Sequence, residues 1–398
     1  MLKIFNGKII APGGLIDNGT VLIKDGIIQD ILAGNPEIEG AEEIDAGGHY
    51  VSAGFIDLHV HGGGGHDFMD NTVEAFLGVA ETHVKYGTTA MYPTTLSSTK
   101  QDILDTIATY QLALDQNTNG SQFLGLHLEG PYFAMAQRGA QDPKYIRDPD
   151  PEEYKEILAD NKVVKRWSAA PELKGAIEFS RYLLSKNILP ALAHTDAVYD
   201  EVLEGYQNGY TLATHLYSGM SGVTRRNAYR YAGVIESAFL IDGMSVEVIG
   251  DGIHLPAPLL QLIYKIKGAD RIALITDAMR AAGMPPGESI LGGLKNGLKV
   301  IVEDGVAKLP DRKSFAGSVT TADCLVRNMV NLAGVTLAEA VKMITETPAA
   351  IMGISDRKGS LVKGKDADLV IFNSNIGIQK TIIKGKVVYQ SVYSSAKV

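Results

Sequence analysis

The sequence lacks features that define several classes of protein. Cys324 is the only cysteine among 398 residues, which excludes an intramolecular disulfide and a zinc site built from thiolates. The 37 basic residues are outnumbered by 46 acidic ones, the net charge is −9, and no basic run is present. A chain with this charge is a poor partner for nucleic acid or an anionic membrane. We therefore expect its ligands to be small molecules.

Long hydrophobic runs are also missing. No stretch approaches the ~18 uninterrupted apolar residues of a membrane span. The first residues are interrupted by Asn6-Gly7 and Pro12-Gly13-Gly14, a pattern that predicts no signal peptide and favours a cytoplasmic location. The hydrophobic fraction of 45% and the charged fraction of 21% are typical of a globular chain with a large core.

Both ends of the sequence show short β-strand patterns. Near the N-terminus these patterns are separated by Asn6-Gly7, Asn18-Gly19 and Asp25-Gly26, which we interpret as hairpin turns. Residues 367–372 and 380–389 have a similar pattern. We therefore predict one small β-sandwich domain assembled from residues 1–53 and 354–398.

The middle of the chain, residues 54–353, alternates between apolar runs and helical patterns. The eight runs are 55–58, 88–92, 123–126, 167–170, 188–193, 211–214, 246–249 and 271–276. This alternation predicts an α/β fold, a (β/α)8 TIM-type barrel. An open doubly wound sheet is the alternative, but the glycine-rich nucleotide turn typical of that fold is missing. The glycine-rich segment 283–318 is predicted as an insertion after the eighth strand.

Residues with metal-binding side chains follow five of the predicted strands. They are His59 and His61, then Glu129, His194, His215 and Asp277. Catalytic groups of barrels gather at the carboxyl ends of the strands, and residues two apart on a strand point to the same side. Burying these imidazoles without partners would be costly. We therefore predict a site for one or two divalent ions, with Zn, Fe, Mn and Co all suited to these ligands.

The predicted chemistry is hydrolysis by a metal-activated water. Asp277 is placed to take a proton from that water and to pass it to a leaving amine. The sequence has no G-x-S-x-G elbow, no H-E-x-x-H and no phosphate loop. His127, one layer deeper on the same strand face as Glu129, is expected to hydrogen-bond rather than to bind metal.

Several motifs resemble those of a known family. The segment 54–61, ending in His59-Val60-His61, resembles the first-strand signature of the amidohydrolase superfamily. Five further motifs are similar to its N-acetylglucosamine-6-phosphate deacetylase branch: 127–131 (HLEGP), 193–195, 214–217 (THLY), 251–254 and 276–278. The resemblance covers most of the chain. It implies a barrel with a β-sandwich, a homodimer, and hydrolysis of the acetamide of a 6-phosphorylated amino sugar to acetate and the free amine.

The resemblance also implies roles for individual residues. Glu129, His194 and His215 would hold the main ion, while His59 and His61 would support a second ion bridged by Glu129. Asp277 matches the catalytic acid/base. The implied substrate-binding residues are Gln141, Ser218, Gly219, Arg226, His254, Ala316, Gly317 and Ser318, with Arg225 as the alternative to Arg226 for binding the phosphate.

Two departures from the family pattern concern the substrate. Ser218-Gly219-Met220 stands where the family usually has Asn-Ala-Met, and Gln141 stands where some members have histidine. An epimeric substrate, N-acetylgalactosamine 6-phosphate, therefore stays open. So do a deaminase and a cyclic-amide hydrolase, although Lys165 lies at the start of the fourth strand and not at the end where a bridging lysine is expected. A non-enzymatic scaffold is disfavoured because all six metal-site positions are filled.

Overall fold

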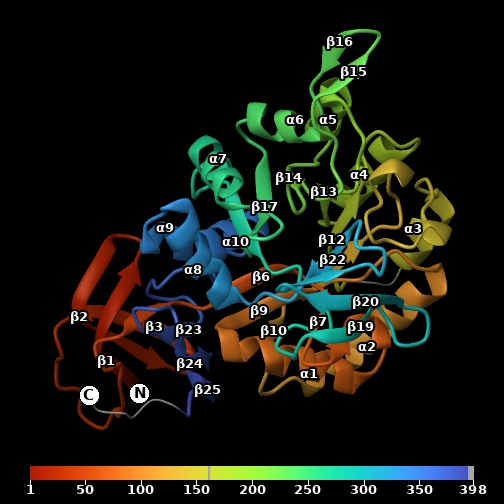
Figure 1. Ribbon diagram of the computed structural model, residues 1–398. Coiled ribbons are helices and arrows are strands. Elements are labelled where there is room, and N and C mark those ends of the chain that lie inside the picture. The colour runs from red at the N-terminus through yellow and green to blue at the C-terminus, as the bar shows by residue number, and fades with distance from the viewer. Residues whose placement is uncertain (160–161, 393–398) are drawn as a thin grey trace.

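A computed structural model describes residues 1–159 and 162–392, apart from the side chain of Arg226. Strands from both ends of the chain form one eight-stranded sheet, and Figure 1 shows them side by side. Its order is β25 (Lys386–Gln390), β24 (Ile378–Ile383), β23 (Leu369–Phe372), β5 (Tyr50–Ala53), β1 (Leu2–Ala11), β2 (Gly14–Lys24) and β3 (Ile27–Ala33), with β4 (Glu42–Asp45) paired to β1. The two ends therefore share a sheet, and the domain boundaries stay a prediction.

The hairpin turns predicted at Asn6-Gly7 and Asn18-Gly19 are wrong, because both pairs lie within strands. Asn6 and Asn18 do adopt left-handed backbones, with φ of 57° and 49°, but both lie inside the long strands. Gly7 pairs with Gly19, and the register shifts on either side of Gly7. The Asn-Gly pairs thus form irregularities within a continuing ladder, because strand pairing persists on both sides of them.

In the described part of the middle region, nine strands run parallel in two sheets. The first sheet contains β10 (Gln122–Phe123), β9 (Thr88–Pro93) and β6 (Phe55–Val60). The second runs β11 (Leu126–Glu129), β12 (Val164–Ala169), β13 (Leu189–Leu192), β14 (Leu212–Ala213), β17 (Ser245–Ile249) and β18 (Ile272–Ile275). Single parallel bridges join the two sheets, from Val60 to Ala278 and from Thr94 to His127.

The predicted third strand, 123–126, is divided in the structure. β10 pairs with β9, whereas β11 pairs with β12 and continues to Glu129. Gly125 lies between them with φ of 143°, a conformation that favours glycine and interrupts the strand. This break lets His127 and Glu129 belong to the strand that faces the functional site.

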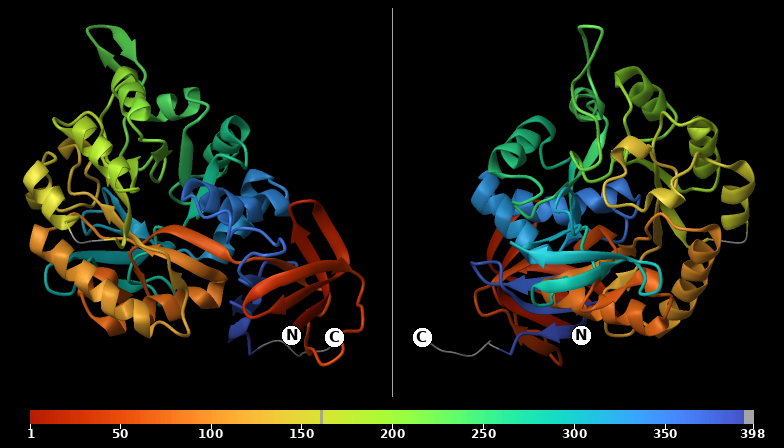
Figure 2. Two further views of the ribbon diagram at one scale, coloured as in Figure 1. Left: turned by 180° about the vertical axis from the view of Figure 1, so that it is seen from behind. Right: turned by 45° about the vertical axis from the view of Figure 1, so that its right-hand side comes forward.

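Helices cover the outer side of the parallel strands (Figure 2). Thr72 and Thr99 cap the first two helices by accepting from the Ala75 and Asp102 amides. The helices are α1 (Val73–His83), α2 (Lys100–Gln116), α3 (Pro151–Ile157), α4 (Ala176–Ser185), α5 (Tyr199–Gln207), α6 (Val234–Leu240), α7 (Ala257–Lys267), α8 (Ala322–Ala333), α9 (Leu337–Ile344) and α10 (Glu346–Ile351). None of the helices in the described ranges is long and apolar enough to cross a membrane.

Three smaller sheets interrupt this alternation in the described residues, the first a short pairing of β7 (Gly62–Gly63) with β8 (His66–Asp67). The predicted insertion is a four-stranded antiparallel sheet of β19 (Gly287–Leu291), β20 (Leu298–Glu303), β21 (Val306–Lys308) and β22 (Phe315–Ser318). A hairpin of β15 (Thr224–Arg226) and β16 (Tyr229–Tyr231) projects from the body of the molecule (Figures 1 and 2). The insertion ends next to the site, because Ser318 forms a parallel bridge with Ala278.

Candidate active site

The six predicted metal-site residues converge at the carboxyl ends of their strands. His59 and Glu129 lie in β6 and β11, and the others follow the ends of their strands. His194, His215 and Asp277 have left-handed backbones, with φ of 47°, 33° and 47°. The chain therefore turns sharply where each strand ends, and these side chains line one cavity with His61 and Glu129.

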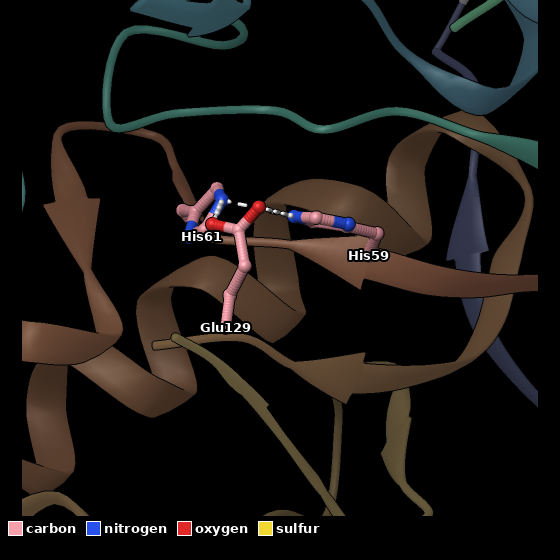
Figure 3. Close-up of side chains that lie close together, drawn as sticks. All are labelled: His59, His61 and Glu129. Atoms are coloured by element: carbon pink, nitrogen blue, oxygen red, sulfur yellow. Dashed lines mark hydrogen bonds and ion pairs between the residues drawn. The ribbon is translucent and has the colours of Figure 1, made fainter. Parts of the chain in front are cut away.

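Glu129 lies at the centre of the cluster. Its Oε1 is 2.9 Å from Nε2 of His215 and 3.3 Å from Nε2 of His194. The same oxygen is 3.6 Å from Nε2 of His59, and Oε2 is 3.5 Å from Nε2 of His61. In Figure 3, His59 and His61 approach the Glu129 carboxylate from opposite sides. The ligand atoms form two groups, His59 with His61 and Glu129, and Glu129 with His194 and His215, each within 4.8 Å.

The orientation of three imidazoles is fixed by backbone carbonyls. Nδ1 of His194 lies 2.8 Å from the Gln137 carbonyl oxygen, and Nδ1 of His215 lies 3.1 Å from that of Ser218. Nδ1 of His61 lies 3.3 Å from the Thr94 carbonyl oxygen. An Nδ1–H that donates to a carbonyl leaves the Nε2 lone pair free, which is the tautomer that binds a metal through Nε2.

Asp277 adds a second carboxylate beside the His59 and His61 rings. Its Oδ1 lies 3.3 Å from Nε2 of His59 and 3.2 Å from Nε2 of His61. The Asp277 amide donates to the His59 carbonyl, and the Asp277 carbonyl accepts from Ser318. Backbone hydrogen bonds on both sides thus hold this carboxylate at the cavity.

The cluster keeps its carboxylates ionised. Burial favours the neutral acid, but the neighbouring histidines, His59 first, hold the pKa of Glu129 well below its usual value. The pKa of Asp277 is lowered against burial by His59 and His61. Burial lowers the pKa of His59, whereas the Asp277 and Glu129 carboxylates outweigh burial at His61 and raise its pKa to about 9. Two anionic carboxylates among buried imidazoles suit a divalent cation.

The cavity has a volume of about 310 Å³. Among the predicted substrate-binding residues, Gln141, Ser218, Gly219, His254 and Gly317 line it. His254 is oriented by Asp251, whose Oδ2 lies 2.6 Å from its Nδ1, and its ring contacts Phe315 at 4.7 Å between centroids. A larger hollow of about 760 Å³ adjoins this one and shares Gln141 with it, but lacks the histidine cluster.

Three other predicted substrate-binding residues are not among the described residues that line the cavity. Ala316 and Ser318 alternate along β22 with Phe315 and Gly317, which line the cavity. Ala316 is fully buried in an apolar cluster, and the Ser318 hydroxyl donates to the Thr276 carbonyl. The strand thus offers Phe315 and Gly317 to a ligand. The backbone of Arg226 lies in the projecting hairpin, and its side chain is outside the described residues.

Gln141 contacts the metal-site carboxylate directly. Its Nε2 donates to Oε2 of Glu129 at 2.8 Å, and its Oε1 accepts from the Ser97 amide. His127 has the predicted hydrogen-bonded position: its Nε2 lies 2.7 Å from the Ser168 hydroxyl. These contacts hold Glu129 and its strand in place.

Sequence reasoning missed a buried ion pair below the cluster. The Arg166 guanidinium binds both oxygens of Glu247, with Nη2 to Oε2 at 2.7 Å, and both side chains are fully buried. Burial favours the neutral acid, but Arg166 holds the pKa of Glu247 below its usual value. The available signal was Glu247, a charged residue between two valines in an apolar run. Phe315 and Tyr217, which also line the cavity, were missed as well.

The chain belongs to the amidohydrolase family, whose model matches residues 50–388. An N-acetylglucosamine-6-phosphate deacetylase from Lysinibacillus sphaericus is 34% identical over 395 residues, 98% of each chain. An N-acetylgalactosamine-6-phosphate deacetylase from Escherichia coli O157:H7 is 32% identical over 380 residues, 95% of this chain and 97% of the other.

Solved structures of such enzymes share the fold. The N-acetylglucosamine-6-phosphate deacetylase of Pasteurella multocida is 29% identical, with a TM-score of 0.91 over 98% of this chain and 100% of that one. A variant of the Mycobacterium smegmatis enzyme, solved with N-acetyl-D-glucosamine-6-phosphate, is 27% identical, with a TM-score of 0.89 over 98% and 99%. The likeness thus spans nearly the full length of each chain.

Proposed function

We propose that this protein is a metal-dependent deacetylase that hydrolyses N-acetyl-D-glucosamine 6-phosphate to D-glucosamine 6-phosphate and acetate. The observation that carries the proposal is the convergence of Glu129, His194 and His215 in one cavity with Asp277. The relatives that act on phosphorylated N-acetyl amino sugars match this chain over nearly its whole length.

The donor set fits a divalent ion of the zinc, iron, manganese or cobalt type. Imidazole and carboxylate ligands suit all four metals. In the proposal, Glu129, His194 and His215 would hold the main ion, and His59 and His61 would hold a second ion together with Glu129. When bound, such ions supply Lewis-acid activation of water and of the acetamide carbonyl.

Asp277 is the proposed general base and acid. Its ionised carboxylate accepts a proton from the attacking water and then delivers a proton to the leaving amine, so that acetate and a free amino group are formed. The backbone hydrogen bonds of Asp277 hold the carboxylate in place without a conformational change. No covalent nucleophile is needed.

The remaining cavity residues are proposed to hold the sugar phosphate. Gln141, Ser218, Gly219, His254 and Gly317 line the cavity and offer polar side-chain or backbone groups. The proposal includes Ala316 and Ser318 as the neighbours on β22 of Phe315 and Gly317, which line the cavity. An acidic protein must supply local positive charge for a phosphate dianion, and Arg226, with Arg225 as the alternative, is the proposed source.

A second candidate is deacetylation of the galacto epimer. It is favoured by the similarity to the E. coli N-acetylgalactosamine-6-phosphate deacetylase. A cyclic-amide hydrolase with a bridging lysine is disfavoured, because Lys165 is exposed on β12. An acetate-release assay on both 6-phosphorylated sugars tests the proposal: release from neither sugar would reject it.

We further infer that the two parallel sheets close into one (β/α)8 barrel. The bridges Val60–Ala278 and Thr94–His127 support this closure. The β-sandwich of residues 1–53 and 354–398, the catalytic domain of 54–353, the homodimer and the cytoplasmic location stay predictions. Chain mass in solution and separate expression of the central segment would test the first three.

A further inference from the structure

The histidine that differs from the others in the cluster is His59. His61, His194 and His215 each have Nδ1 within 3.3 Å of a backbone carbonyl oxygen. Nδ1 of His59 is buried and has no hydrogen bond to any described residue. The oxygen that faces it is Oε2 of Glu247, 3.7 Å away. The orientation of His59 therefore depends on a side chain, which can be substituted, and not on the backbone.

Glu247 is itself held rigidly. Arg166 binds both of its oxygens, and the second amino group of Arg166 also donates to the Thr214 hydroxyl at 2.7 Å. Nη1 of Arg166 donates to the Leu58 carbonyl at 3.2 Å, one residue before His59. The ion pair therefore connects β6, β12, β17 and the residue that follows β14, and its carboxylate lies 3.7 Å from the His59 ring nitrogen.

A purely structural role does not explain the arrangement. A fully buried ion pair adds little net stability over well-packed apolar side chains of similar volume, because both charges lose their hydration. An apolar pair would fill the same space but would leave the His59 Nδ1 facing no acceptor. The carboxylate does what apolar side chains cannot, since its negative charge favours a proton on the nitrogen that faces it.

We propose that Glu247, held in place by Arg166, is a positioning residue for His59. Its carboxylate, 3.7 Å from Nδ1 of His59, favours the proton on that nitrogen, and thereby the tautomer and ring orientation in which Nε2 faces Glu129 and Asp277. The Nε2 lone pair is then available to the ion that His59 shares with His61. This inference rests on the proposed function only in requiring an ion at His59 and His61.

The test compares double variants that leave no unpaired buried charge. Arg166→Met/Glu247→Leu removes the acceptor, whereas Arg166→Met/Glu247→Gln keeps a neutral acceptor at the same position. Lys267→Met is a control for the loss of a buried charge far from the site, because Lys267 donates to the Ala238 and Ile241 carbonyls. Metal stoichiometry and affinity are measured on the full-length proteins with zinc and with manganese as probes, together with thermal unfolding.

We expect the Leu variant to fold and to retain the ion of Glu129, His194 and His215. Its affinity for the second ion should fall about 10- to 100-fold, the usual effect of losing a partner behind a metal-binding histidine. The Gln variant should recover part of this affinity, and Lys267→Met should not change it. Equal second-ion affinity in the Leu variant and the wild type would overturn the inference, as would a wild type that binds only one ion. Failure to deacetylate either sugar phosphate would instead reject the proposed function.

Discussion

Oε1 of Glu129 lies 2.9 Å from Nε2 of His215, although 86 positions separate the two residues in the sequence. Nε2 of His194 lies 3.3 Å from the same oxygen. Three potential ligands from three strands thus surround one small volume at the cavity, and the predictions below depend on this arrangement.

The substitution Asp277→Asn should slow the reaction strongly without removing the main ion. Asp277→Asn keeps the shape of the side chain but cannot accept a proton, so kcat should fall about 10²- to 10⁴-fold. Initial rates of acetate release give kcat, and mass spectrometry of the native protein gives the metal content. Turnover at the wild-type rate would contradict a proton-transfer role.

Substitution of the proposed phosphate ligand should affect only phosphorylated substrates. A charge-assisted hydrogen bond contributes about 1.5–3 kcal/mol, so Arg226→Ala should raise KM about 10- to 100-fold for the 6-phosphate. Arg225→Ala tests the alternative ligand on the same strand, and Arg230→Ala, on the paired strand β16, is the control. An equal rise in KM for the unphosphorylated sugar would show that the arginine does not bind phosphate.

Removal of the metal should inactivate and destabilise the protein. A ligand that binds only the folded state raises the unfolding temperature, so the chelated protein should unfold at a lower temperature. His59→Asn/His61→Asn should retain one ion per chain, at Glu129, His194 and His215. Undiminished activity after complete chelation, checked by elemental analysis, would be incompatible with the proposed chemistry.

The metal-free protein should lose stability in alkaline solution through His61. The folded-state pKa of His61 is raised to about 9 from an ordinary value of 6.5, so the folded state binds the proton more tightly than the unfolded state. Its stabilising contribution is complete below pH 6.5 and is lost as the pH rises through about 9. Urea unfolding of the chelated wild type and of His61→Asn should therefore show a wild-type decline across this range that the variant lacks. Parallel pH profiles would assign the decline to other groups.

The metal cluster was predictable because parallel strands bring their carboxyl ends together at one edge. A histidine or carboxylate that follows an apolar strand is therefore expected to lie at this edge. The place of His194 and Asp277 in the site could be predicted from their sequence positions alone. Glu129 was predicted for the same reason, although the break at Gly125 places it in a separate strand, β11.

Other features depend on contacts that the sequence does not encode locally. Arg166 and Glu247 are 81 positions apart. Their pairing follows from the arrangement of β12 and β17 in the sheet, and the local sequence around either residue does not predict it. The Asn6-Gly7 segment has turn composition, but pairing with β2 carries the strand through it. Alternation of side chains along β22 predicts two faces of the strand but not which face lines the cavity. Ala316 was therefore predicted to bind substrate, whereas Phe315 lines the cavity.

Anomalous diffraction from crystals grown with zinc or manganese tests the central claim most directly. We expect a strong peak about 2.0–2.2 Å from an oxygen of Glu129 and from Nε2 of both His194 and His215. If crystals of the active enzyme showed an anomalous peak elsewhere and none beside these three side chains, the account would be contradicted.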